Sequence, residues 1–213
     1  MSQSTPIHGS VQSQPPQRRE ILTVASELFG YRGYRNTSWS DVAQRVYLSE
    51  TAIHHYFESK QQCLYEVMAD GILAGQRAFD LHTAGVDFNI GFERVFRQAF
   101  EKNRFETCRN RVLMVEQPLM IRRRAKPKEE EARQMALEQM LTLERSWIDY
   151  LKTAMIDGWI PKADPQLLWK AIFGLYDSIW LWYRLDGDLT LEMIGDRFLP
   201  QFMTMAGVSS ARG

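Results

Sequence analysis

The segment NTSWSDVAQRVYLSETAIHHYFESK, residues 36–60, contains two short helical patterns separated by a tight break. In the first pattern, apolar residues recur at spacings of three, one and three, on one face of a helix: Trp39, Val42, Ala43 and Val46. Ser38 precedes this helix and Asp41 follows three residues later. The pair is a variant of the capping box, with Asp in place of Glu or Gln, and it predicts a helix start at this point.

The second pattern begins after Ser49, a residue type that often caps helices, and its apolar side consists of Ala52, Ile53 and Tyr56. The linker between the two patterns leaves room only for a sharp turn at Tyr47-Leu48. Two short helices joined in this way form a helix-turn-helix, whose second helix can lie in the DNA major groove. The segment therefore predicts a DNA-binding unit.

Residues 18–68 resemble the DNA-binding region of the TetR family of bacterial transcriptional repressors. The matching pieces are RREILTVASELFGYRGY at 18–34, NTSWSDVA at 36–43, LSETAIHHYFESK at 48–60, and an apolar continuation at Leu64 and Val67. The family usually has Gly where Tyr47 stands, Gly and a small residue where Thr51-Ala52 stand, and commonly a Tyr where His54 stands. The resemblance implies an all-α fold: an N-terminal three-helix helix-turn-helix domain plus a larger helical ligand-binding and dimerisation domain.

The predicted DNA surface comprises the recognition helix, its neighbours and the first turn of the next helix: Arg18, Arg19, Thr37, Ser38, Ser49, Glu50, Thr51, His54, His55, Tyr56 and Lys60. Thr51 is the better candidate for a base contact, and Tyr56 and Lys60 are expected to hold phosphates. For Lys60 this role is implied by the family, whose lysine at this position contacts a backbone phosphate. Arg18 and Arg19 are expected either to reach phosphates or the minor groove, or to end a solvated tail.

Composition limits the other possibilities. The chain has 213 residues, 45% of them hydrophobic, and two distant cysteines, Cys63 and Cys108, that fit no metal or redox spacing. No cofactor or metal site is expected. There is no apolar run of membrane-spanning length and no signal pattern, so a cytoplasmic location is expected. The net charge is zero, and DNA affinity must therefore come from placed groups rather than from bulk charge.

Three segments are predicted. Residues 1–16 are rich in Ser, Gln and Pro and should form a disordered arm. Residues 17–62 form the helix-turn-helix domain, and residues 63–213 form a helical effector-binding and dimerisation domain. Within the latter, helical patterns cover about 60–81, 88–100, 111–121, 128–156, 165–185 and 190–206. In the TetR family the terminal pair packs against its two-fold copy, which implies a homodimer through residues 165–206.

The larger domain is rich in aromatic residues and predicts a site for a hydrophobic effector, with Phe92, Phe96, Trp147, Tyr176 and Trp180 as candidate lining residues. The segment WLWYRLDGDLT at 180–190 resembles, less specifically, repressors of fatty-acid and sterol catabolism that sense acyl-CoA thioesters. Basic residues at 122–128 would suit the CoA phosphates. Such a charge run at a helix junction is also typical of a solvated face.

No catalytic grouping of Ser, His and Asp, phosphate loop or paired-Cys motif is present in the sequence, so an enzyme is not expected. Two functions fit: a repressor released by a hydrophobic molecule, for which an acyl-CoA is one candidate, or a DNA-binding structural or division-control protein without a small-molecule effector. The pattern does not distinguish a repressor from an activator.

Overall fold

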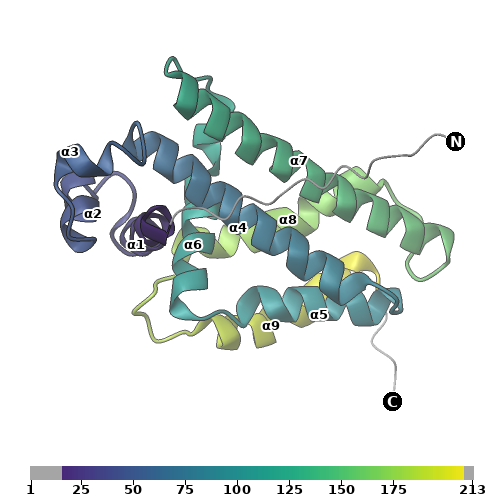
Figure 1. The fold of residues 1–213 in the computed structure, drawn as a ribbon. Coiled ribbons are helices and arrows are strands. Elements are labelled where there is room, and N and C mark those ends of the chain that lie inside the picture. The colour runs from purple at the N-terminus through teal and green to yellow at the C-terminus, as the bar shows by residue number, and fades with distance from the viewer. Residues whose placement is uncertain (1–15, 209–213) are drawn as a thin grey trace, which may run out of the picture.

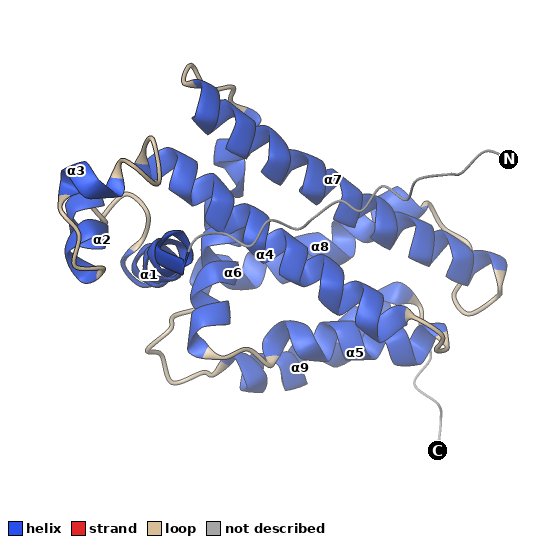
Figure 2. Cartoon of the chain, in the orientation of Figure 1, coloured by secondary structure: helices blue, strands red, loops and turns tan. Residues whose placement is uncertain are grey.

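The structure, a computed structural model, describes residues 16–208, and every regular element among them is a helix (Figure 2). This confirms the predicted fold class. The arm predicted to be disordered, residues 1–16, lies outside the described residues apart from Pro16. Among the described residues, no helix is both long enough and apolar enough to cross a membrane.

The helices follow one another in the order α1 (Pro16–Arg32), α2 (Trp39–Arg45), α3 (Glu50–Ile53), α4 (Lys60–Thr83), α5 (Phe88–Phe100), α6 (Arg104–Glu116), the 3-10 turn η1 (Gln117–Ile121), α7 (Pro127–Ile156), α8 (Pro165–Trp182) and α9 (Leu191–Ala206). Helices α1, α2 and α3 form a compact unit at one end of the molecule, and α4 runs from this unit into the larger domain (Figure 1). There α4 packs most extensively against α7, and also against α5 and α6.

The starts of α2 and α3 follow the predicted capping pattern. Ser38 Oγ accepts a hydrogen bond from the Asp41 amide at 3.0 Å, and Asp41 Oδ2 accepts one from the Ser38 amide at 2.7 Å. Ser49 Oγ accepts from the Ala52 amide at 3.1 Å. These side chains satisfy amides that have no partner inside the helix, and so define where each helix begins.

The helix expected at about 111–121 differs from the structure. Helix α6 begins at Arg104, where Asn103 and Glu106 form a reciprocal capping box, and it ends at Glu116. The α-helical geometry stops one residue before Gln117-Pro118, and the chain continues as the 3-10 turn η1. Pro118 lacks an amide hydrogen, which accounts for the change of helix type.

Helices α1 and α6 approach closely, which docks the N-terminal unit on the larger domain. A Cβ atom built on Gly30 of α1 would lie 2.5 Å from the Cys108 carbonyl oxygen and 2.6 Å from the Cys108 Cα of α6. Only glycine fits this contact, because any side chain would force the two backbones apart. The N-terminal unit therefore touches the larger domain at α6 as well as through the continuous helix α4.

The turn between α2 and α3 has a left-handed residue that is not glycine. Tyr47 has a φ of 56° and its side chain is 95% exposed. The Leu48 amide donates to the Ala43 carbonyl at 2.9 Å and the Tyr47 amide donates to the Gln44 carbonyl at 3.2 Å, closing α2. A left-handed conformation costs a residue with a Cβ roughly 1–2 kcal/mol relative to glycine. Tyr47 bears this cost without compensating burial.

We therefore expect Tyr47→Gly to raise the free energy of unfolding by about 1 kcal/mol, measured by urea denaturation at equilibrium. Tyr47→Ala is the matched control, because it removes the same ring but keeps the strained backbone, and it should bring no gain. Equal stabilisation by both variants would show that the ring, and not the backbone, is unfavourable.

Candidate DNA-binding surface and effector cavity

The recognition helix α3 is short and presents a polar outer face. Thr51, His54 and His55 are exposed, while Ile53 is fully buried and Tyr56 is half-buried. Residues 54–56 continue the helix as a turn, with the Tyr56 amide donating to the Ile53 carbonyl at 3.0 Å. The exposed side chains are thus displayed from a surface anchored by a buried isoleucine.

Aromatic packing fixes the angle between α2 and α3. Trp39 lies edge-on to Phe57 at a centroid distance of 6.1 Å, and Trp39 also meets the His54 ring at 6.4 Å. Ser40 of α2 donates a hydrogen bond to Glu50 of α3. Of the predicted DNA residues, Arg19, Ser38, Ser49 and Glu50 are exposed, although the Ser38 and Ser49 hydroxyls also cap helices.

Lys60 is turned toward the protein. Its ammonium donates to the Tyr34 carbonyl at 2.9 Å and to the Thr37 carbonyl at 2.7 Å, and it lies 4.2 Å from the centroid of the Tyr34 ring. Partial burial lowers the pKa of Lys60, while the charges of Glu116 and Asp41 oppose this shift. Lys60 therefore braces the loop between α1 and α2 from the first turn of α4.

Arg18 and Thr37, which the sequence placed on the DNA surface, are turned toward partners inside the protein. Arg18 Nη2 lies 2.6 Å from a Glu66 carboxylate oxygen, and its guanidinium sits 4.4 Å from the centroid of the Phe57 ring. Thr37 is 1% exposed, and its hydroxyl donates to the Gly33 carbonyl at 3.0 Å. Both side chains therefore have partners inside the protein.

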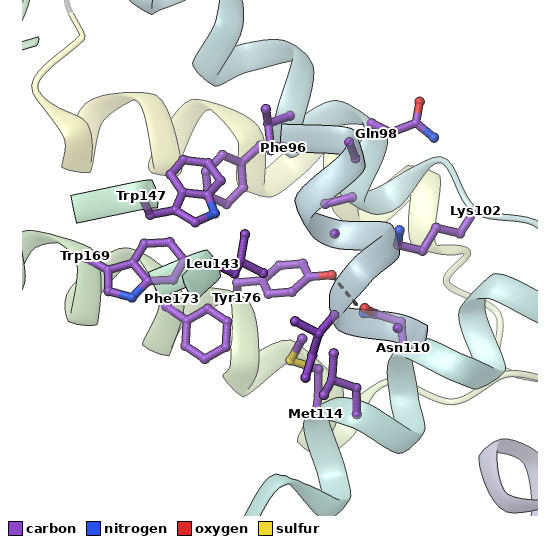
Figure 3. A pocket seen from close by; sticks show the side chains of 17 residues that line it. Phe96, Gln98, Lys102, Asn110, Met114, Leu143, Trp147, Trp169, Phe173 and Tyr176 are labelled. Atoms are coloured by element: carbon purple, nitrogen blue, oxygen red, sulfur yellow. Dashed lines mark hydrogen bonds between the residues drawn. The ribbon is translucent and has the colours of Figure 1, made fainter. Parts of the chain in front are cut away.

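A cavity opens among α4, α5, α6, α7 and α8 in the larger domain (Figure 3). Its volume is about 110 Å³, and it is partly open to solvent. Small residues of α4, Gly71 and Gly75, form one wall. The opposite side is aromatic, with Trp147 and Trp169 stacked at a centroid distance of 5.1 Å. A largely apolar hollow lined by aromatic side chains is typical of a site for a small hydrophobic molecule.

Three of the five aromatic residues predicted for this site line the cavity: Phe96, Trp147 and Tyr176. Phe92 instead lies in the core, fully buried between Phe88 and Trp147. Trp180 is 1% exposed and packs against Tyr176 and Tyr183 rather than the cavity. Helical periodicity shows which side chains point inward. It does not show whether an inward-pointing side chain lines a cavity or packs against another helix.

The prediction did not include several lining residues, of which the polar ones matter most. Asn110 Nδ2 donates to the Tyr176 hydroxyl at 2.9 Å, and burial raises the pKa of Tyr176 far above its usual value. Lys102 and Gln98 also line the cavity. Burial lowers the pKa of Lys102, with Glu106 opposing the shift and Arg109 adding to it. No sequence motif marks Lys102, which lies in the short linker between α5 and α6.

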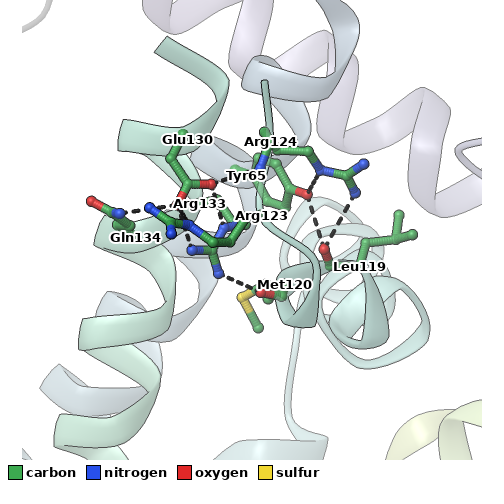
Figure 4. A network of polar contacts seen from close by, with 8 residues as sticks. All are labelled: Tyr65, Leu119, Met120, Arg123, Arg124, Glu130, Arg133 and Gln134. Atoms are coloured by element: carbon green, nitrogen blue, oxygen red, sulfur yellow. Dashed lines mark hydrogen bonds and ion pairs between the residues drawn. The ribbon is translucent and has the colours of Figure 1, made fainter. Parts of the chain in front are cut away.

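Arg123 and Arg124 of the basic segment 122–128 take part in a network of hydrogen bonds and ion pairs at the start of α7 (Figure 4). Arg124 Nε donates to the Tyr65 hydroxyl at 2.6 Å, and the Arg124 amide donates to Glu130 at 2.8 Å. Arg133 pairs with the same carboxylate at 2.7 Å. Hydrogen bonds from Arg133 and the Arg124 amide lower the pKa of Glu130 to about 2.

This segment does not border the cavity. Leu143, which lines the cavity, lies sixteen residues after Pro127 on α7, or about 24 Å along the helix axis. The prediction that residues 122–128 form a basic rim at the effector site is therefore not supported. Within the segment, Arg123 and Lys126 pair with Glu130 and Glu129, and Arg124 donates to the Tyr65 hydroxyl and the Leu119 carbonyl.

Helices α8 and α9 carry large apolar side chains on their outer surface. Leu181 is 78% exposed, and Leu167, Trp182 and Met193 are also exposed. The Trp182 ring meets the half-buried Phe198 at 6.3 Å, joining the two helices across this surface. A contiguous exposed apolar surface of this kind is typical of a protein–protein interface.

Comparison with known proteins agrees with this geometry. Residues 21–67 match the family model described as bacterial regulatory proteins, tetR family, and residues 113–206 match that of a tetracyclin repressor-like C-terminal domain. The HTH-type transcriptional repressor KstR2 of Mycolicibacterium smegmatis is 27% identical over 210 residues, covering 94% of this chain and 95% of the relative.

Two solved structures share the fold. The ketosteroid transcriptional regulator KstR2 of Mycobacterium tuberculosis superposes with a TM-score of 0.70 at 21% identity, covering 96% of this chain and all of that one. AibR in complex with isovaleryl coenzyme A and operator DNA superposes with a TM-score of 0.71 at 20% identity, covering 87% of this chain and 97% of that one. At these identities the likeness concerns the fold.

Proposed function

The chain belongs to the TetR family of bacterial regulatory proteins. From this premise we propose that it is a repressor that binds a near-palindromic operator as a homodimer. We propose further that a hydrophobic small molecule releases it from the operator. As a transcriptional regulator of this family it is not an enzyme. The main observation behind the proposal is that α4 contacts both sites. Its Lys60 donates hydrogen bonds to the loop between α1 and α2, and its Gly71 and Gly75 line the cavity. In this proposal residues 17–62 form the DNA-binding domain and residues 63–213 the effector-binding and dimerisation domain.

The proposed DNA contacts are the exposed residues on and around α3. Thr51, His54 and His55 are exposed on the recognition helix and face away from its buried side. Thr51 is the proposed base contact, since a hydroxyl on the first turn of a recognition helix can reach base edges in the major groove. Arg19 and Tyr56 are proposed to hold phosphates. Lys60 supports them by fixing the loop between α1 and α2.

We expect Thr51→Ala to weaken binding to an operator selected from random-sequence DNA by about 5- to 100-fold, while leaving affinity for random DNA unchanged. The measurement is a fluorescence anisotropy titration at several salt concentrations. Thr142→Ala is the matched control, because Thr142 is an exposed threonine on α7, far from α3 in the chain. An equal loss on both DNAs would identify Thr51 as a backbone contact.

Dimerisation is proposed through the exposed apolar surface of α8 and α9. The DNA site requires it, because two recognition helices must enter successive major grooves roughly 34 Å apart to read a near-palindrome. Leu181, Trp182 and Phe198 lie on this surface. A two-fold axis through it would bury the same residues from both copies.

We expect Leu181→Asp to give a monomer at micromolar concentration by sedimentation velocity, with loss of tight operator binding, because the dimer would bury an unpaired charge. Leu181 is 78% exposed in the single chain, so this change should not disturb folding. Leu81→Asp is the control, since Leu81 is 74% exposed on α4 and lies outside the proposed interface. A dimeric Leu181→Asp protein would place the interface elsewhere.

The proposed effector acts by differential affinity for two forms of the dimer. A ligand shifts the protein only as far as its affinities for the DNA-bound and released forms differ. The cavity walls belong to α4, α5, α6, α7 and α8, so a ligand that moves α4 also moves the braced helix-turn-helix. A small change in the distance between the two recognition helices prevents both from seating. An acyl-CoA is one candidate class, and a solved relative of the same fold, AibR, is seen with isovaleryl coenzyme A.

We expect at least one of lauric acid, lauroyl-CoA and an uncharged hydrophobic compound to lower operator affinity by about 5- to 150-fold, the usual range of allosteric coupling. Gly75→Leu should abolish the response while retaining operator binding, because the new side chain enters the cavity beside Leu143. If no compound of these classes changes operator affinity, the sensing role fails. The alternative, a DNA-binding structural or division-control protein without an effector, would then be preferred.

A further inference from the structure

Lys102 is the one cationic side chain among the residues that line the cavity. It lies in the linker between α5 and α6, and in Figure 3 its side chain is directed toward the cavity on the side where Gln98 and Asn110 lie. Within residues 16–208, no carboxylate oxygen lies within 4.0 Å of its ammonium. The charge therefore faces a mostly apolar hollow without a close counter-ion.

A partly buried ammonium without a counter-ion is unfavourable, because burial removes part of its hydration. The lowered pKa of Lys102 has this cause. The lysine does not contribute the apolar surface that the neighbouring Phe96, Trp147 and Phe173 provide. A group that is costly in the empty cavity becomes favourable when a ligand supplies the missing negative charge.

The polar groups beside Lys102 suit a small anion. Tyr176 accepts a hydrogen bond from Asn110, which leaves its own hydroxyl proton available to an acceptor in the cavity. Because burial raises the pKa of Tyr176, the phenol stays protonated at neutral pH and remains a donor. Gln98 also lines the cavity, but its Nε2 donates to the Glu101 carbonyl at 3.3 Å. The Lys102 ammonium and the Tyr176 phenol are thus two donors that match the two oxygens of a carboxylate.

The charge beyond Lys102 does not favour a larger anion. Lys102 also lines a second, polar hollow between the α5–α6 linker and the start of α9. There Arg104 is accompanied by two acidic residues, Glu101 and Glu192. Two cations and two carboxylates offer no excess positive charge for several phosphate groups. An apolar cavity that contains one ammonium, with no carboxylate within 4.0 Å of it among residues 16–208, thus favours a ligand with a single negative charge.

We propose that the effector is an apolar carboxylic acid whose body fills the aromatic cavity and whose carboxylate pairs with Lys102. This inference rests on the proposed function, because it specifies the ligand of the same cavity. It identifies Lys102 as the residue that selects acids over neutral molecules of the same size. Phe96, Trp147, Trp169 and Phe173 supply the apolar contacts.

The test compares three probes of equal chain length on the full-length protein: laurate, 1-dodecanol and lauroyl-CoA. Binding is followed by tryptophan fluorescence, since the stacked rings of Trp147 and Trp169 line the cavity. A charge-assisted hydrogen bond predicts that laurate binds about 10- to 100-fold more tightly than dodecanol. Lys102→Met should remove this preference while retaining dodecanol binding, and Lys102→Arg should keep most of it. Lys152→Met, at an exposed lysine of α7, is the matched control and should behave as the unchanged protein.

Each other outcome contradicts the proposal in a different way. Equal binding of laurate and dodecanol, or a preference that survives in Lys102→Met, overturns the role of Lys102 but leaves the cavity as a sensor of hydrophobic molecules. Tighter binding of lauroyl-CoA than of laurate overturns the free acid in favour of the thioester. Binding of none of the three overturns both this inference and the proposed effector cavity.

Discussion

The burial of α4 is the constraint on which the other features depend. From Gln62 to Ala69 every residue of this helix is buried, so the helix cannot rotate or slide without exposing core on every side. Its first turn holds the loop between α1 and α2 through Lys60, and one turn later Glu66 pairs with Arg18 of α1. Its middle forms the wall of the cavity at Gly71 and Gly75. Because one stiff element meets both sites, it is the route by which, in the proposed function, a change at the cavity wall would reach the N-terminal unit.

Further contacts restrict which movements are possible. Ser59, the N-cap of α4, donates to Glu129 of α7 at 2.5 Å, and Tyr65 accepts from Arg124 just before α7. These bonds tie the N-terminal part of α4 to the start of α7. Trp147, which lines the cavity, belongs to the same helix α7 whose first turn contacts the N-terminal end of α4. A ligand that changes the packing of Trp147 would therefore act on a helix that also contacts the DNA-binding end of α4. Arg124 of the basic segment, for which the sequence left a ligand site and a solvated face open, contributes one of these structural bonds.

The local features of the N-terminal unit could be predicted from the sequence, whereas the partners of its charged residues could not. The caps at Ser38 and Ser49 involve atoms three residues apart, so spacing alone predicts them. Arg18 and Glu66 are 48 residues apart, and only the packing of α1 on α4 brings them together. The cavity shows the same limit: periodicity marks Phe92 and Phe96 as inward-facing, but tertiary packing places one in the core and the other at the cavity. Lys102 gave no signal because a single lysine in a linker resembles any solvated residue.

The position of Lys102 also bears on how binding could reach the DNA. Lys102 precedes α6 by two residues, and Asn110, which orients the Tyr176 hydroxyl, lies within α6. Cys108 of the same helix meets Gly30 of α1 so closely that no side chain fits between them. In the proposed complex, a carboxylate bound by Lys102 and Tyr176 would act on α6 on both sides of Cys108. Lys102 lies before Cys108 in the chain, and Asn110, which bonds Tyr176, lies after it. Since α1 is also held to α4 by Arg18 and Glu66, it cannot follow α6 freely. The N-terminal unit is thus held between α4 and α6, which both border the cavity. In the proposed function, a ligand that changes the separation of these two helices would change the orientation of α3.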